Sequence, residues 1–138
     1  MRFNYLSKFL LAAPVILACA FAYAYGGDIY VVTRPDVKLS SDDIREIYLG
    51  DKQFSGDVRL VPVDNQATQA EFVVKVLAMN PQRYNTLWVK KAFRDALTPP
   101  LVKATDAEVL EFVKRTRGAV GYVSSVPRDN DVIVVGKF

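Results

Sequence analysis

The sequence contains no histidine and only one cysteine, Cys19, in 138 residues. Without an imidazole, the usual general base of a serine or cysteine nucleophile is missing, and so is the commonest nitrogen ligand of zinc. The carboxylates, lysines and tyrosines that remain stand in no recognisable catalytic pairing. We therefore predict a protein that is not an enzyme and that uses no cofactor or metal.

The sequence also lacks a strong excess of either charge, because it has 18 basic and 15 acidic residues and a formal net charge of +3. The net charge falls to +1 without Arg2 and Lys8, which belong to an expected leader. This balance gives no electrostatic reason to expect nucleic acid as a partner. A hydrophobic content of 51% and a charged content of 24% exclude a disordered chain, and the length suits one domain.

The N-terminus has the pattern of a secretory signal peptide. Residues 1–8 are basic, residues 9–21 form an uncharged apolar run, and small residues follow. The run is shorter than the roughly 20 residues of a membrane-spanning helix, and Pro14 interrupts it. The best cleavage site ends at Ala24, so we predict a leader over residues 1–24, a periplasmic location and one domain over residues 25–138.

Cys19 leaves an alternative open. Residues 15–19 (VILAC) also resemble the box of a bacterial lipoprotein, in which Cys19 would become a lipidated N-terminus. The apolar residues 20–23 that follow favour cleavage near Ala24, since the tether of a lipoprotein is usually polar. An uncleaved anchor is the third alternative.

Strand and helix patterns alternate along the rest of the chain. Apolar, β-branched runs predict strands, and apolar residues at helical spacing between capping and stop signals predict helices. The predicted strands cover residues 28–33, 58–63, 119–124 and 131–135, and the predicted helices cover residues 42–49, 68–79, 81–96 and 105–117. Pro62 suggests that its strand ends there or lies at an edge. This order predicts an α/β domain with a mixed, largely parallel sheet covered by helices.

The segment between the second strand and its helix is the best candidate for a ligand site. A helix start exposes free N–H groups and the positive end of the helix dipole, which attract anions. The candidate ligands here are Asn65, Gln66, Ala67, Thr68 and Gln69, backed by Ser40 and Ser41 at the preceding helix start. The alternative is that these residues only cap helices, and an unpaired Asp64 beside the site would repel an anion.

The helix over residues 81–96 carries three aromatic residues at helical spacing, Tyr84, Trp88 and Phe93. They would suit a ligand patch, but their spacing favours packing into the core.

Two motifs resemble the phosphate-type periplasmic solute-binding proteins of ABC transporters. The segment LSSDDIREIYLGDKQFSGDVRLVPVDNQATQAEF resembles their "LS…I(F/Y)LG…W..G..(I/V).PV" motif, and RGAVGYVSS resembles their "GAIGYV" strand. The two motifs follow in order within residues 29–125, most of the chain after the leader. The resemblance implies one three-layer lobe of the type 2 periplasmic-binding-protein fold, in a short, single-lobe, secreted variant.

The resemblance also implies which positions would bind. Thr68 stands at the family's threonine position and Asp64 at the aspartate before the loop, whereas Asn65, Gln66 and Ala67 replace its Gly-Ser-Gly. Pro62 stands where the family has an arginine, so the bidentate clamp of a guanidinium is missing there. The implied function is a solute-binding-like module that binds a small, phosphate-like anion weakly and meets a membrane permease in transport. The alternative is a ligand-free protein–protein adaptor of the cell envelope, acting as a homodimer or on an envelope partner.

Overall fold

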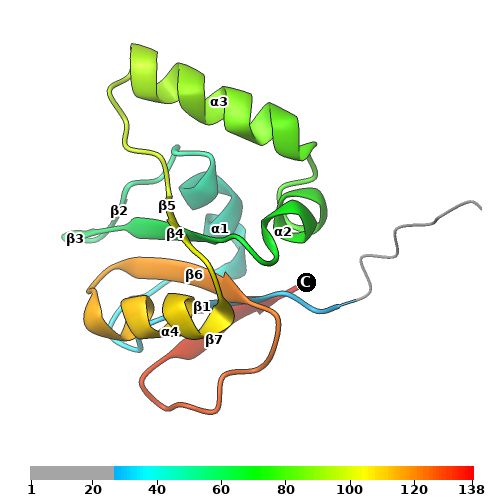
Figure 1. Ribbon diagram of the computed structural model, residues 1–138. Coiled ribbons are helices and arrows are strands. Elements are labelled where there is room, and N and C mark those ends of the chain that lie inside the picture. Colours follow the sequence, from blue (N-terminus) through cyan, green and yellow to red (C-terminus); the bar gives the residue numbers. More distant parts are fainter. Residues whose placement is uncertain (1–26) are drawn as a thin grey trace, which may run out of the picture.

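The computed structural model describes residues 27–138, in which one five-stranded sheet lies between two layers of helices (Figure 1). The predicted leader, its predicted cleavage site near Ala24 and Cys19 lie outside the described residues. Along the chain the elements are β1 (Tyr30–Thr33), α1 (Ser41–Tyr48), β2 (Phe54–Ser55), β3 (Val58–Arg59), β4 (Val61–Asn65), α2 (Gln69–Lys75), α3 (Pro81–Arg94), β5 (Leu101–Lys103), α4 (Asp106–Arg115), β6 (Ala119–Val123) and β7 (Ile133–Lys137). None of the helices in this part of the chain is long and apolar enough to cross a bilayer.

The strand order is β5-β4-β6-β1-β7, and four of the five strands run in the same direction. β4 pairs in parallel with both β5 and β6, while β1 pairs antiparallel with β6 and with β7. The predicted mixed, largely parallel sheet is therefore confirmed, with β1 as the one reversed strand. The small hairpin β2-β3 stands apart from this sheet.

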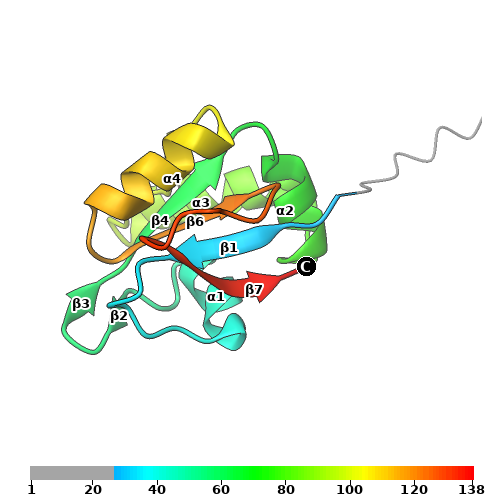
Figure 2. The same ribbon diagram turned by 90° about the horizontal axis from the view of Figure 1, so that it is seen from below.

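The two faces of the sheet carry separate cores because side chains alternate along each strand. On β6, Val120 and Tyr122 face the core under α1, α2 and α3, whereas Ala119 and Val123 face α4. All five residues of β6 are buried. This arrangement gives the predicted three-layer lobe, with α4 alone on one face (Figure 2).

Three aromatic rings fill the centre of the larger core. Phe72 of α2 stacks on Tyr122 with ring centroids 3.8 Å apart, and Tyr48 of α1 meets both rings edge-on. The Tyr48 hydroxyl lies 2.9 Å from the carbonyl oxygen of Val63 and 3.0 Å from that of Val120. The end of α1 is thus fixed against the two central strands, β4 and β6.

Several boundaries differ from the predictions. β2 and β5 were not predicted, because two- and three-residue strands have too few positions to show alternation, and the predicted strand over residues 58–63 is divided at Leu60 into β3 and β4. β4 continues through Pro62 to Asn65, and this is possible because β5 pairs with β4 only from Val63 onward. The side of the strand beside Pro62 is therefore open and needs no N–H donor.

The chain approaches itself most closely at Gly118, in the turn before β6. Its φ of +85° lies in the left-handed region, and a Cβ atom there would overlap the carbonyl oxygen of Arg59. The carbonyl of Gly118 accepts a hydrogen bond from Val61 N–H. Gly118 therefore allows β4 and β6 to start side by side.

We expect Gly118→Ala to lower the free energy of unfolding by about 3 kcal/mol or more, since backbone overlap adds to the left-handed strain. Gly56→Ala is the matched control, because Gly56 also has a positive φ (+60°) but a Cβ atom added there would meet no other atom within 4 Å. The control should lose only about 1 kcal/mol. Urea denaturation of both variants measures the difference, and equal losses would contradict the close approach.

Candidate functional site

The carboxyl ends of β4 and β6 meet the starts of α2 and α4, and a buried carboxylate, Asp64, lies at this junction. Asp64 is 2% exposed. Its oxygens accept hydrogen bonds from the hydroxyls of Tyr122 at 2.9 Å and Tyr84 at 3.1 Å, and from Gln69 Nε2 at 3.1 Å. Strands β4 and β6 and helices α2 and α3 are thereby linked through one side chain.

The electrostatics of this cluster follow from its burial. Desolvation raises the pKa of Asp64, although hydrogen bonds from Tyr122, Tyr84 and Gln69 act in the opposite direction. Burial is the main cause that raises the pKa values of Tyr84 and Tyr122, and the charge of Asp64 raises them further. Both hydroxyls therefore keep their protons and remain donors to the carboxylate. Asp64 is not the unpaired acid considered from the sequence, since its oxygens are occupied within the protein.

Asn65, the first predicted ligand, is fully buried and engaged in structural hydrogen bonds. Its Nδ2 donates to Asp106 Oδ1 at 2.6 Å and to the carbonyl of Tyr122 at 3.1 Å, and its Oδ1 accepts from Ala67 N–H. Asp106 in turn accepts a hydrogen bond from the Ser124 hydroxyl. The Asn65 side chain thus ties β4 to α4 and to β6, in agreement with the capping alternative.

The backbone that follows Asn65 is also largely occupied. Gln66 N–H donates to the carbonyl of Lys103, and Thr68 N–H donates to the carbonyl of Asn65. Thr68 is the N-cap of α2, a helix of seven residues. Its hydroxyl oxygen is buried and, among the side chains of residues 27–138, is the one buried polar atom that lacks a hydrogen-bond partner.

Ser40 and Ser41 lie at a different place from the other predicted ligands. Ser40 is the N-cap of α1, and its N–H donates to the Asp43 carboxylate at 2.8 Å. The Ser55 hydroxyl of β2 bonds to the carbonyl of Lys38, so this helix start lies beside the hairpin that precedes β4. The segment with Thr68 follows the opposite end of β4, as the positions of β2, β3 and α2 in Figure 2 show.

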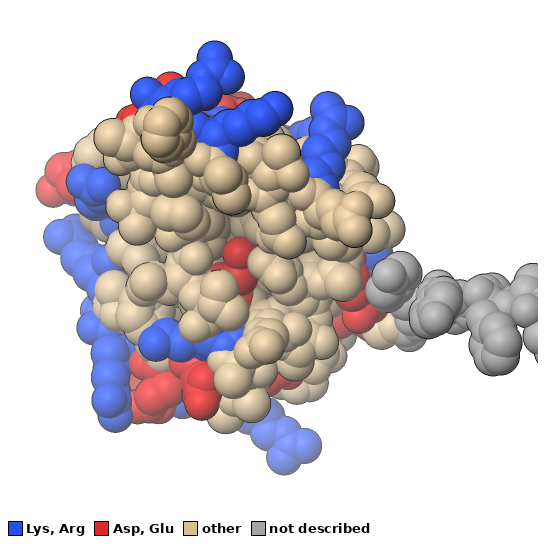
Figure 3. All heavy atoms as spheres, turned by 45° about the horizontal axis from the view of Figure 1, so that its top comes forward, with Lys and Arg blue, Asp and Glu red and all other residues tan. Residues whose placement is uncertain are grey.

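A groove between α3 and β5 was not predicted. It has a volume of about 600 Å³, with Asp64 and Tyr84 at its inner side and Val89, Phe93 and Val102 among its outer residues. Tyr84 and Trp88 are buried as predicted, but the prediction for Phe93 is wrong, since Phe93 is 91% exposed. Figure 3 shows this side of the molecule as a mainly uncharged, hollowed surface with Lys and Arg at its margin.

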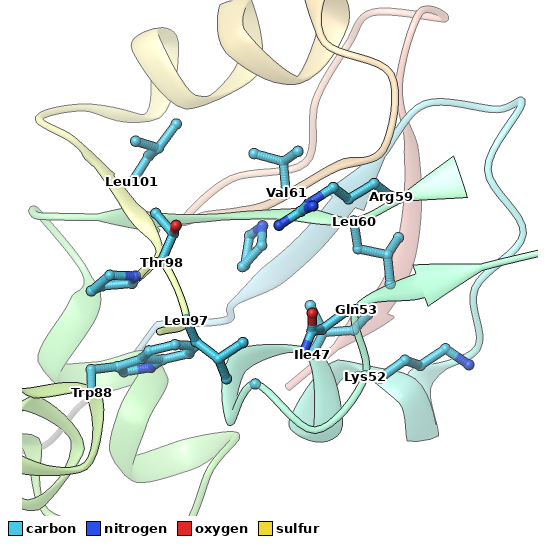
Figure 4. Close-up of a pocket in the computed structure, with 13 residues that line it drawn as sticks. Ile47, Lys52, Gln53, Arg59, Leu60, Val61, Trp88, Leu97, Thr98 and Leu101 are labelled. Carbon is cyan, nitrogen blue, oxygen red and sulfur yellow. The ribbon is translucent and has the colours of Figure 1, made fainter. Parts of the chain in front are cut away.

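A second, smaller pocket lies at the opposite end of β4, where Arg59, Pro62 and Trp88 line a volume of about 250 Å³ (Figure 4). No sequence pattern indicated it, because its residues come from α1, β3, β4, α3 and β5 and are far apart along the chain. No cluster of acidic or cysteine residues suited to a metal ion is found within residues 27–138.

Comparison with solved structures finds the same fold in substrate-binding proteins. A phosphate ABC transporter substrate-binding protein with bound phosphate, from Clostridium perfringens, matches with a TM-score of 0.58 and 19% identity over 79% of this chain. An ABC-type phosphate transport receptor from Vibrio cholerae matches with a TM-score of 0.53 and 18% identity over 79% of this chain. The matches span only 45% and 46% of those two proteins.

Neither a model of a known protein family nor a curated protein matches the sequence. The structural matches confirm the expected lobe of a periplasmic-binding-protein fold.

The raised pKa of Asp64 predicts a pH-dependent stability. A carboxyl group with a higher pKa in the folded state stabilises the fold fully below its unfolded pKa, near 4, and this contribution is lost as the pH rises through the folded pKa. We expect the stability difference between wild type and Asp64→Asn to shrink as the pH rises from 4 to 7. Urea denaturation across this range measures it, with Asp57→Asn in the exposed turn of the β2-β3 hairpin as the control. A difference that stays constant with pH would contradict the prediction.

Proposed function

We propose that this chain is a periplasmic, non-catalytic solute-binding module that binds a small, phosphate-like anion at the start of α2. The observation that carries the proposal is the buried Thr68 hydroxyl without a partner. A hydroxyl left unpaired in the fold costs stability, and a ligand that accepts its hydrogen bond recovers this cost. The phosphate bound in the structurally similar Clostridium perfringens protein supports the class of ligand.

The geometry limits which groups bind. Asn65 and the N–H groups of Gln66 and Ala67 serve the fold, so the Thr68 hydroxyl and the first free N–H groups of α2, beginning at Gln69, remain. Thr68 as a whole is half-buried, so rotation about its Cα–Cβ bond brings the hydroxyl to the surface. Three donors hold the Asp64 carboxylate within the cluster, and repulsion of the anion is thereby reduced. Without a guanidinium clamp the affinity is weak, and a membrane permease is the partner in transport.

The exposed edge of the sheet favours a second candidate function, protein docking through a second copy of this chain. β5 is an edge strand, and its Leu101 and Val102 side chains are 43% and 58% exposed. An edge with unpaired backbone groups and exposed apolar side chains is a template for pairing with another strand. Two copies joined at β5 would extend the sheet and cover Val89 and Phe93 of both grooves.

The anion site is tested by thermal unfolding in phosphate and in sulfate at fixed ionic strength. Phosphate at 100 times its dissociation constant adds about 2.7 kcal/mol, a shift of several degrees for a domain of this size. We expect Thr68→Val to abolish the shift and Thr68→Ser to keep it. Without an anion, Thr68→Val should be more stable than wild type by about 1 kcal/mol, because the unpaired hydroxyl is gone. An unchanged phosphate shift in Thr68→Val would contradict the site.

The dimer is tested by sedimentation velocity over a range of protein concentrations. We expect wild type to associate with increasing concentration and Val102→Lys to remain monomeric, since a charge at the centre of β5 opposes pairing. Val126→Lys is the matched control, because Val126 is also 58% exposed but lies outside the sheet. A wild type that stays monomeric, or equal effects of the two lysines, would favour a different envelope partner.

A further inference from the structure

We propose that the pocket at the start of β4 binds a small monocarboxylate with an apolar body. The site goes beyond the anion site at α2, since it lies at the other end of β4. It is bounded by the end of α1, by β4 and by the segment that joins α3 to β5, as Figure 4 shows. The volume of about 250 Å³ is just below the range of about 300–1,000 Å³ typical for drug-sized ligands, so the ligand is small.

One side of the pocket is an apolar wall. Its residues are Ile47, Leu60, Val61, Trp88, Leu97 and Leu101. Trp88 is 6% exposed, and its indole N–H donates to the carbonyl of Tyr48 at 3.0 Å, so the ring has a fixed position. Gly50 lies against the ring, where a Cβ atom would come within 2.8 Å of Trp88 Cη2. The wall is therefore preformed, and an apolar ligand body gains burial at little ordering cost.

Polar groups converge from the other side. In Figure 4 the Arg59 side chain extends from β3 toward the middle of the pocket, where Gln53 also points, and Thr98 lies on the far side of the pocket. No ion pair or side-chain hydrogen bond of Arg59 exists within residues 27–138, and the same holds for side-chain hydrogen bonds of Gln53 and Thr98. All three side chains thus have their hydrogen-bonding capacity available.

The charges near the pocket leave one positive group for a ligand. Lys52 runs away from the pocket in Figure 4 and pairs with Asp43 at 3.0 Å. Lys91, close to the pocket through its contact with Gly50, pairs with Asp51 at 2.9 Å. In the part of the chain that the structure describes, no acidic residue lines the pocket and Arg59 is its one unpaired cation. Arg59 therefore selects a ligand with one negative charge.

A carboxylate fits this arrangement better than phosphate or sulfate. A guanidinium donates two parallel hydrogen bonds to a planar carboxylate, and the Gln53 amide and Thr98 hydroxyl supply further donors. An inorganic anion has no apolar part to cover the wall formed by Trp88 and the leucines. Specificity thus comes from the combination of one charge with an apolar body of limited size.

The test uses phenylacetate as the probe and the purified protein. Trp88 is the single tryptophan of the chain and lines the pocket, so its fluorescence reports binding directly. We expect a saturable change with a dissociation constant in the millimolar range or tighter. Arg59→Met, which keeps the length of the side chain but removes its charge, should weaken binding by about tenfold or more. The neutral amide, phenylacetamide, should bind wild type weakly and Arg59→Met equally weakly.

Two controls separate this site from other effects. Arg94→Met removes an exposed arginine of α3 that lies outside the pocket and should leave the phenylacetate titration unchanged. Thr68→Val should also leave it unchanged, so that the two ligand sites can fail independently. Circular dichroism verifies that Arg59→Met is folded, as expected for an exposed residue. Wild-type binding by Arg59→Met, equal affinity for acid and amide, or no saturation would overturn the proposal.

Discussion

The buried carboxylate of Asp64 is the constraint on which most of this structure depends. A carboxylate taken out of water is costly unless donors surround it, and here Tyr84, Tyr122 and Gln69 meet that requirement. The three donors come from α3, β6 and α2, so the carboxylate can be satisfied only when all three elements are in place. Tyr84 lies within hydrogen-bond distance of both carboxylate oxygens, so loss of one donor weakens the solvation of the buried carboxylate, and loss of two leaves an oxygen unpaired.

The same requirement fixes α3, the helix that shapes both concavities. Tyr84 is bonded to Asp64, Trp88 to the carbonyl of Tyr48, and Lys91 to the carbonyl of Leu49 and to Asp51. These residues recur at intervals of four and three, so they form one stripe along the helix. The stripe anchors α3 against the end of β4 and the end of α1. The opposite side of α3 is left to solvent, which explains why Val89 and Phe93 are exposed.

The sequence predicted the layers better than the sites. Long helices such as α3 and α4 are readily predicted, because each has many apolar positions that recur on one face of the helix. Thr105 caps the start of α4, since Thr105 Oγ1 accepts from Glu108 N–H, while the Glu108 carboxylate accepts from Ala104 N–H. The sequence did not predict β2 or β5, because strands of two or three residues are too short to show the alternation of apolar and polar side chains. The prediction for Phe93 is wrong because Phe93 follows Trp88 by five residues, which places it on the side of the helix opposite the buried stripe.

The site residues show a further limit of sequence patterns. A polar residue after a strand is typical of a ligand site and equally of a structural bond, and the pattern does not distinguish between them. Asn65 has a structural role because its amide donates a hydrogen bond to Asp106, 41 residues later in the chain, at 2.6 Å. The resemblance places the family's arginine at Pro62, on β4 itself, and so does not indicate Arg59. In the fold the guanidinium of Arg59 reaches the same pocket that Pro62 lines, from three residues earlier.

The two proposed ligand sites depend differently on what lies beyond this lobe. The structural similarity covers less than half of each of the two similar proteins, so the matched part of this chain has no counterpart to the rest of them. An anion at the start of α2 sits at an open end of the sheet, where a single lobe gives it few donors and much solvent. The pocket with Arg59 and Trp88 is lined by residues within the range 47–101, so its apolar wall and its charge come from the same lobe. The proposed anion site at the end of β4 therefore depends more on donors from outside this lobe than the proposed carboxylate site at its start.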